Sequence, residues 1–251
     1  MCRGALESTE SSSIYGIWDY GDDDDDSEYL GSFERTAVPQ LDNPHLDGVA
    51  SWTRVELLEQ TVEPGTWTTA DGQTLRVITD NSPVWGTVAD TDTDQSDPQP
   101  DPGSAIAGDT VHAGWFFDLP NAGEMAVSDV IIRDGKVLVI SFTPGKDPCG
   151  HGGTSIFHAL DSCSGARPGS GFFVNIDEVV HDAGAGETTI GRTSSDWKEP
   201  TGVEFSGRLQ PPVILRKGNL EYHYLSSSTG DVHKQEAAGT RLGIYYWLQV
   251  E

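Results

Sequence analysis

The residues with the clearest spacing for chemistry are five aspartates in an acidic stretch, at Asp90, Asp92, Asp94, Asp97 and Asp101. Calcium binds several hard oxygen ligands from one flexible loop, and Asp90, Asp92 and Asp94 match the first three ligand positions of an EF-hand-type loop, with Asp101 at its last position. Glutamine stands where such a loop needs glycine, and three nearby prolines restrict wrapping around an ion. The pattern predicts either a calcium site at these aspartates or a solvated acidic loop.

A second acidic run, at residues 22–26, is a weaker metal candidate. Consecutive side chains of an extended chain point to alternate faces, so at most every second aspartate can reach one ion. Charge runs of this kind are usually solvated.

Two cysteines flank one predicted strand, Cys149 before it and Cys163 after it. A disulfide between them would close a loop of about 15 residues, which the chain-entropy model values at roughly 3 kcal/mol. Spacing alone does not fix connectivity, so the alternative is two unpaired thiols in turns. The third cysteine, Cys2, lies in an N-terminal end, residues 1–13, that we expect to be disordered.

Cys149 also opens the sequence CGHGG, in which a cysteine stands beside a histidine and a glycine pair. Such a turn suggests a nucleophile or an esterase-type oxyanion loop, but no Gly-x-Ser-x-Gly elbow and no His-Glu-x-x-His motif accompanies it. A glycine-rich turn with a structural cysteine explains the same residues.

The seven tryptophans suggest either a binding surface or a core. Aromatic residues in strands usually pack between sheets, so most of them are expected in the core. Trp197 lies in a polar stretch and is the one that we expect to be available for binding. The set consists of Trp18, Trp52, Trp67, Trp85, Trp115, Trp197 and Trp247.

The composition limits the partners of the chain. Its 251 residues carry 15 lysines and arginines against 40 acids, a formal net charge of −25. Nucleic-acid binding is therefore not expected, because few cations are present to displace counterions from phosphates. No apolar run approaches the roughly 20 residues of a membrane-spanning helix. The acidity indicates solubility at a cell surface or in a saline habitat, or attraction of divalent cations.

Short apolar runs separated by turn residues predict an all-β chain. Asp134-Gly135 between two such runs predicts a tight hairpin, and Asp161 begins a turn that ends at Gly165. Residues 51–61 read as a strand or a short helix, and Trp67 lies on a short strand between two turns. Long loops are expected at residues 29–50, 87–108 and 181–207. The remaining expected strands are residues 14–18, 75–79, 127–133, 137–142, 155–160, 171–180, 212–215, 221–225 and 242–250.

The order of several short motifs resembles the C-terminal propeller domain of the type IV pilus tip-associated adhesin family (PilC/PilY type). The central match is GWFFDLP at 114–120 with the glycine-glutamate turn at 123–124, followed by DPC at 147–149, GGT at 152–154 and ALD at 159–161. Upstream, YGIWD at 15–19, LLEQT at 57–61 and LRVIT at 75–79 are similar to the family's strands. Downstream, QPPVIL at 210–215, EYHYLSS at 221–227 and a divergent ending at 239–248 resemble its last blade.

The resemblance implies a partial β-propeller of antiparallel blades with long inserted loops, over residues 14–251. It also implies a non-enzymatic surface protein that supports pilus assembly, attachment and twitching motility. Minor pilins or other pilus tip proteins, and a host or abiotic surface ligand, are the implied partners, and the implied location is the pilus tip or outer-membrane surface. No secretory h-region follows Met1, and the family's calcium loop would precede residue 15, so we interpret the chain as a C-terminal fragment or as a split or truncated gene product.

Two alternatives of other classes stay open. One is a calcium-binding structural module ordered by the aspartates at 90–101. The other is a propeller enzyme of the quinoprotein-like type, which needs a cofactor or paired carboxylates at a central channel.

Overall fold

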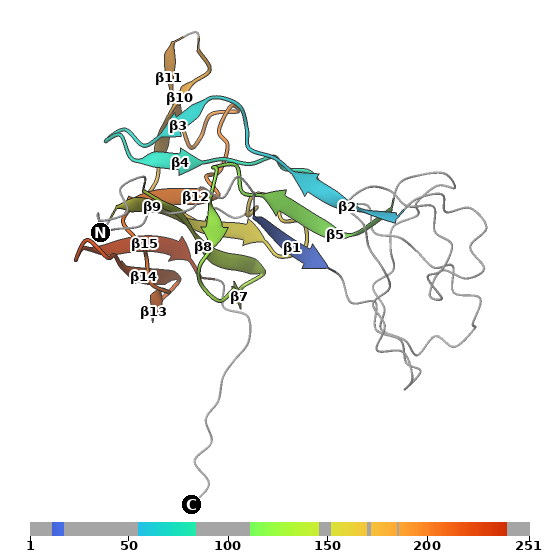
Figure 1. Ribbon diagram of the computed structural model, residues 1–251. Helices are drawn as coiled ribbons and strands as arrows, with labels where there is room; N and C mark the ends of the chain where they lie inside the picture. Colours follow the sequence, from blue (N-terminus) through green and yellow to red (C-terminus); the bar gives the residue numbers. More distant parts are fainter. Residues whose placement is uncertain are drawn as a thin grey trace, which may run out of the picture.

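The computed structural model describes residues 12–17, 55–83, 111–145, 152–169, 172–184 and 186–239, with no account of the side chains of Val55, Glu56, Val111 and Ala113. In this part of the chain the secondary structure consists of fifteen strands and no helix (Figure 1). The strands are β1 (Ser13–Ile17), β2 (Val55–Gln60), β3 (Thr66–Thr68), β4 (Thr74–Arg76), β5 (Val111–Asp118), β6 (Met125–Ala126), β7 (Ile131–Arg133), β8 (Lys136–Pro144), β9 (Gly153–Asp161), β10 (Glu178–Asp182), β11 (Glu187–Gly191), β12 (Gly202–Ser206), β13 (Val213–Lys217), β14 (Leu220–Ser226) and β15 (Val232–Ala238).

The strands form three sheets. One has three strands in the order β1-β5-β2, and another has three in the order β13-β14-β15. The third has nine strands, β11-β10-β3-β4-β12-β9-β8-β6, with β7 also paired to β8. The pairings are antiparallel except for β2 with β5, which is parallel. The all-β prediction is therefore confirmed, while one pair departs from purely antiparallel blades.

The best-defined local element is the hairpin of β7 and β8. Asp134 and Gly135 both have positive φ angles, 49° and 70°, as a two-residue turn matched to the strand twist requires. β8 and β9 then pair over nine residues, from Lys136↔Asp161 to Pro144↔Gly153. The predicted hairpin and the strands at 137–142 and 155–160 are confirmed.

The strand expected at 127–133 is interrupted. β6 ends at Ala126 and β7 begins at Ile131, although both pair with β8. Between them, the hydroxyl of Ser128 accepts a hydrogen bond from the backbone N–H of Ile140 at 3.2 Å. This side chain takes a backbone donor that a continuous strand would have used.

Two further expectations were wrong, and both concern residues between β9 and β13. The apolar residues Phe172, Phe173 and Ile176 lie in buried turns rather than in a strand, and β10 begins only at Glu178. The stretch 181–207, expected as a loop, contains β11 and the central strand β12. β11 and β15 were missed because neither contains a run of apolar residues, and polar or charged residues occupy most of their positions.

Residues 51–61, left open between strand and helix, contain the strand β2. The short strand at Trp67 and the C-terminal strands at 212–215 and 221–225 are confirmed as β3, β13 and β14. The loops at 29–50 and 87–108, the strand at 242–250 and residues 1–11 of the N-terminal end lie outside the described residues.

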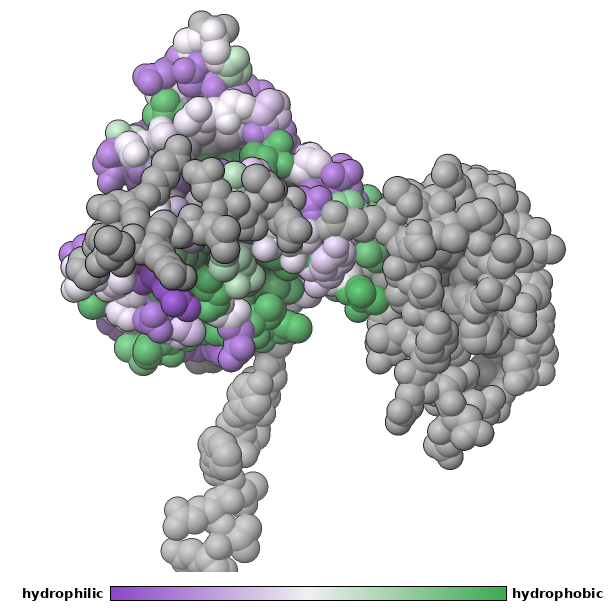
Figure 2. All heavy atoms as spheres, in the orientation of Figure 1, coloured by the Kyte–Doolittle hydropathy of each residue, from purple (hydrophilic) through white to green (hydrophobic). Residues whose placement is uncertain are grey.

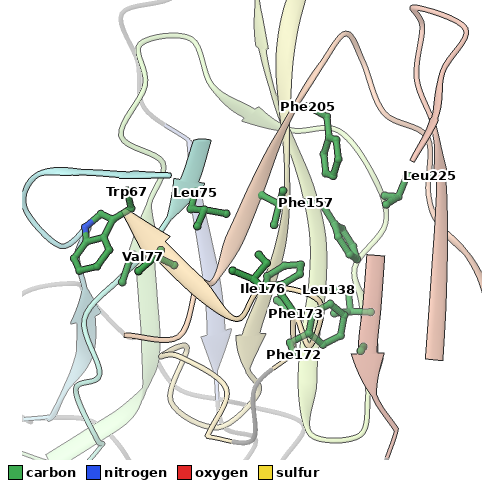
Figure 3. Close-up of a cluster of buried hydrophobic side chains, with 14 of the residues drawn as sticks. Trp67, Leu75, Val77, Leu138, Phe157, Phe172, Phe173, Ile176, Phe205 and Leu225 are labelled. Atoms are coloured by element: carbon green, nitrogen blue, oxygen red, sulfur yellow. The ribbon is translucent and has the colours of Figure 1, made fainter. Parts of the chain in front are cut away.

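The larger core lies between the nine-stranded sheet and the β13-β14-β15 sheet. Its centre is an aromatic group in which Phe172 and Phe173 pack edge to face at 4.9 Å, with Phe157 beside both (Figure 3). Figure 3 shows Leu138 next to this group and Trp67 at the far end of the cluster. Burial of these large side chains is the main favourable term of the fold.

A smaller core surrounds Trp115 on β5. The indole packs between Gly16 and Gly165, where an added Cβ would lie within 2.3 Å and 2.2 Å of ring atoms. Its Nε1–H donates to the carbonyl of Ser162 at 3.1 Å. The tryptophan thus ties β1, β5 and the turn after β9 together, and glycine is the one residue that leaves room for it.

Candidate functional site

The predicted calcium ligands are not covered by the structure. Asp90, Asp92, Asp94, Asp97 and Asp101 lie outside the described residues, as does the acidic run at 22–26. Among the residues that are described, no group of three or more histidine, cysteine, aspartate or glutamate side chains is placed to hold a metal ion.

The structure describes only one of the two cysteines of the predicted disulfide. Cys163 is exposed in the turn after β9, while Cys149 and His151 lie outside the described residues. The turn itself is confirmed, because Asp161 Oδ1 accepts hydrogen bonds from the backbone N–H groups of Cys163 and Ser164 at 3.0 and 2.9 Å. The pairing of the two cysteines stays a prediction.

Trp197, the proposed binding tryptophan, is half-buried against the larger core. Its indole N–H donates to Glu199 Oε2 at 2.9 Å, and the Arg192 guanidinium lies 5.3 Å from the ring centre. Burial raises the pKa of Glu199, against the opposing effects of Trp197 and Arg192. The indole is therefore partly occupied by contacts within the chain, and only its exposed part is available to a ligand.

The chemically densest cluster that the structure describes was not predicted. Arg76 on β4 and Glu124, in the turn before β6, form a two-pronged ion pair, with Nη1 2.6 Å from Oε1 and Nη2 3.1 Å from Oε2. The Glu124 side chain is completely buried and that of Arg76 is 7% exposed. A buried pair of this geometry satisfies both charges only while both partners are present.

Ser141 on β8 and His158 on β9 complete the cluster, and both are fully buried. The Ser141 hydroxyl donates to Glu124 Oε1 at 2.5 Å and lies 2.9 Å from His158 Nε2. The serine proton is used by the carboxylate, so Nε2 carries the histidine proton and donates to Ser141 Oγ. His158 Nε2 lies 3.8 Å from Glu124 Oε1, too far for a direct hydrogen bond.

The electrostatics of the cluster follow from burial and from Arg76. Burial alone would raise the pKa of Glu124. The nearby N–H of His158, the hydrogen bonds from Arg76 and Ser141, and the positive charge of Arg76 together outweigh burial and lower this pKa to about 2. Burial lowers the pKa of His158, so its imidazole is neutral. His158 Nδ1 finds no hydrogen-bond partner among the described residues, which suits an unprotonated nitrogen.

Serine, histidine and glutamate are the residue types of a hydrolytic triad, but the arrangement differs from one. In a triad the histidine lies between the serine and the acid, and it takes the serine proton. Here the serine lies between the other two, its proton points to the carboxylate, and all three side chains are buried. The cluster is arranged to join β4, β8, β9 and the turn at Glu124.

A second ion pair, in which only the glutamate is buried, joins the β7–β8 hairpin to the β13-β14-β15 sheet. Arg133 binds Glu221 through Nε at 2.7 Å and Nη2 at 2.6 Å, and hydrogen bonding to this guanidinium lowers the pKa of Glu221. Beside it, His223 is fully buried against Phe172, with ring centres 5.1 Å apart. Burial lowers the pKa of His223 to about 4.

Sequence reasoning missed both ion pairs because their partners are 48 and 88 positions apart. One signal was present. Arg76 interrupts the apolar strand run at 75–79, and a charged residue within a buried strand needs a partner of opposite charge. Nothing in the sequence identifies Glu124 as that partner among 40 acidic residues.

Comparisons with known proteins give one relationship. The chain is 26% identical over 165 residues to the type IV pilus biogenesis factor PilY1 of Pseudomonas aeruginosa, in strain PAO1 and likewise in strain PAK. The match covers 64% of this chain, and the chain spans 11% of the length of these curated relatives. No protein-family model matches the chain, and no solved structure matches it.

None of the described residues belongs to a helix long and apolar enough to cross a membrane. The chain is thus all-β where it is described, and it is distantly and partially similar to a type IV pilus biogenesis factor. A buried ion pair lies within its largest sheet, and a partly exposed one joins that sheet to the β13-β14-β15 sheet.

Proposed function

We propose that this chain is part of a type IV pilus-associated surface protein that supports pilus assembly, attachment and twitching motility without catalysing a reaction. The observation that carries the proposal is the similarity to PilY1 over 165 residues. The motifs from the tyrosine-glycine strand of β1 to the tyrosine-rich strand β14 occur in the family's order, which a chance match of one segment would not produce.

We further propose that the described sheets are blades of a partial propeller. The nine-stranded sheet can be divided between β4 and β12, which pair only through Gly202↔Arg76 and Val203↔Leu75. One group is then β11-β10-β3-β4, and the other is β12-β9-β8-β6 with β7 as a fifth strand paired to β8. Four antiparallel strands are the usual content of a propeller blade. The sheet β13-β14-β15 would supply three strands of another blade.

A non-enzymatic role agrees with the use of the buried polar residues. The polar side chains of this cluster bind one another in the buried junction between strands: Ser141 is hydrogen-bonded to Glu124 and His158, and Glu124 is paired with Arg76. The proposed partners are other pilus tip proteins, minor pilins among them, and a host or abiotic surface ligand, with a location at the pilus tip or outer-membrane surface.

Calcium is the one cofactor proposed, at Asp90, Asp92, Asp94, Asp97 and Asp101, because of their spacing. Its test is thermal unfolding of the chain with and without millimolar calcium. A bound ion raises the melting temperature, and the double variant Asp92→Ala with Asp94→Ala abolishes that rise. Equal melting temperatures in both conditions would refute the site.

The functional proposal is tested by a chimera. The matched region of P. aeruginosa PilY1 is replaced by this chain, and twitching zones are compared among the parent strain, a strain lacking PilY1 and the chimera. The proposal expects zones above those of the strain lacking PilY1. A control chimera with Glu124→Gln and Arg76→Glu, in which the buried pair is destroyed, should fall to the level of that strain. A chimera that is made in normal amounts and still gives no gain contradicts the proposal.

A further inference from the structure

Among the strands that the structure describes, β13 has a partner on one side only and forms an edge of its sheet, at the lower rim of the body in Figure 1. A two-residue turn, Gly218-Asn219, with Gly218 at φ 65°, joins it to β14 and makes Lys217↔Leu220 a hydrogen-bonded pair. Hydrogen-bonded and non-hydrogen-bonded pairs alternate along an antiparallel ladder. The backbone groups of Ile214 and Arg216 therefore point away from β14, and no backbone group of the described part of the chain binds them.

The outer face beside this edge is apolar. Val213 and Leu215 are 63% and 55% exposed, and Tyr222 and Tyr224 stand directly opposite them on β14. Figure 2 shows hydrophobic residues in green at the lower part of the body, where Figure 1 places β13 and β14. An edge of this kind is a ready template for another strand.

The edge is also cationic, within a chain whose formal charge is −25. β13 ends in Arg216 and Lys217, both exposed. Arg133, whose side chain is 41% exposed, lies on the other face of the sheet, where it binds the buried Glu221 opposite Arg216. Three cations thus border the edge. Glu221, which lies between Arg216 and Arg133, is already paired with Arg133.

We propose that the β13 edge binds an extended peptide segment of a partner protein in which acidic and apolar residues alternate. The segment adds antiparallel to β13, with its backbone paired to Ile214 and Arg216. Its apolar side continues the face of Val213 and Leu215, and its acidic side lies near Arg216 and Arg133. This is strand addition, in which the backbone supplies affinity and the side chains supply selectivity.

A second copy of this chain is a poorer occupant. Two cationic edges repel each other. Pairing along the five residues of β13 also buries far less surface than the roughly 1,000 Å² that a stable dimer needs. The inference rests on the geometry of the edge and does not depend on the proposed function.

The test uses the whole chain and a fluorescent peptide of alternating glutamate and valine, read by anisotropy. The expected result is saturable binding that weakens with salt, with little binding of a lysine-valine peptide of the same length. A glutamate-valine peptide that is N-methylated along one edge should also fail, because it has lost the donors for pairing. The variant Arg216→Glu with Lys217→Glu should bind about tenfold more weakly or worse, while Arg208→Glu, an exposed cation off the edge, serves as the matched control and leaves binding unchanged.

Three results would overturn the inference. Equal binding of the N-methylated peptide would show that the backbone edge is not used. Absence of binding up to millimolar peptide would show that the edge binds no such segment, and that Arg216 and Lys217 serve only to prevent edge-to-edge aggregation. A dimer in light scattering that is abolished by the charge-reversed variant would assign the edge to a second copy.

Discussion

Replacing Glu124 by glutamine removes one charge from the buried cluster and keeps the shape of the side chain. The amide nitrogen then faces the Arg76 guanidinium, donor against donor, and a buried cation loses its counter-charge. Breaking a buried pair from one side costs about 3 to 5 kcal/mol. The pKa gives a similar figure, because a carboxyl held at about 2 instead of 4.5 corresponds to about 3 kcal/mol in favour of the folded, ionised form. We therefore expect a loss of about 3 kcal/mol in the free energy of unfolding.

The assay is urea unfolding at pH 7, followed by circular dichroism and tryptophan fluorescence. The matched control is Lys198→Gln, which breaks a partly exposed pair with Glu63 at 2.6 Å and should cost less than about 1 kcal/mol. Replacing both Arg76 and Glu124 by methionine should recover part of the loss, since no unpaired charge is left. A cost of Glu124→Gln no larger than that of the control would refute the claim that this pair holds the sheet junction.

Three other outcomes are expected. Because burial holds the pKa of His223 at about 4 against an ordinary 6.5, the unfolded chain takes up this proton first, and up to about 3 kcal/mol of stability is lost as the pH falls from about 6.5 to about 4. His223→Phe should flatten that part of a urea-midpoint profile against pH, and an unchanged slope would contradict the assignment. Gly165→Ala should lower the free energy of unfolding by about 2 to 4 kcal/mol, because the new methyl group overlaps the Trp115 indole and the φ of +66° is strained for alanine. Gly72→Ala is the matched control: its φ is +87° but the space around it is open, so it should cost about 1 kcal/mol. Equal costs in urea unfolding would refute the packing argument. Mass spectrometry of non-reduced peptides from oxidised protein should find Cys149 joined to Cys163, and alkylation of both thiols without reductant would exclude the bridge.

Much of the local structure follows from the sequence, because short-range chemistry decides it. Asp134-Gly135 accepts positive φ angles that most residue pairs resist, so the hairpin is determined by two residues. Asp161 fixes its turn through its own side chain. The strands at 137–142 and 155–160, which lie next to these two turns, are found where they were expected.

The failures have a different origin. Phe172 and Phe173 suggested a strand because apolar residues mark burial, yet a buried turn has the same composition. β12 was missed because Gly202 and Glu204 resemble loop residues, while its central place in the sheet is fixed by pairing with β4 and β9. Tertiary contacts, rather than the propensity of the segment, decide such cases.

The candidate site shows the same limit more strongly. The sequence points to aspartates with metal-like spacing, which lie outside the described residues, whereas the densest polar cluster is assembled from β4, β8, β9 and a turn. Its members are single polar residues in apolar surroundings. Only the three-dimensional fold brings them together.

The most direct test of the central claim is the amount of surface pilin sheared from the PilY1 chimera described above. If the chain carries out the part of PilY1 that it resembles, the chimera will return more pilin to the surface than the strain lacking PilY1, and the Glu124→Gln, Arg76→Glu chimera will not. If a stable chimeric protein leaves surface pilin at the level of the strain lacking PilY1, the proposed pilus function is contradicted.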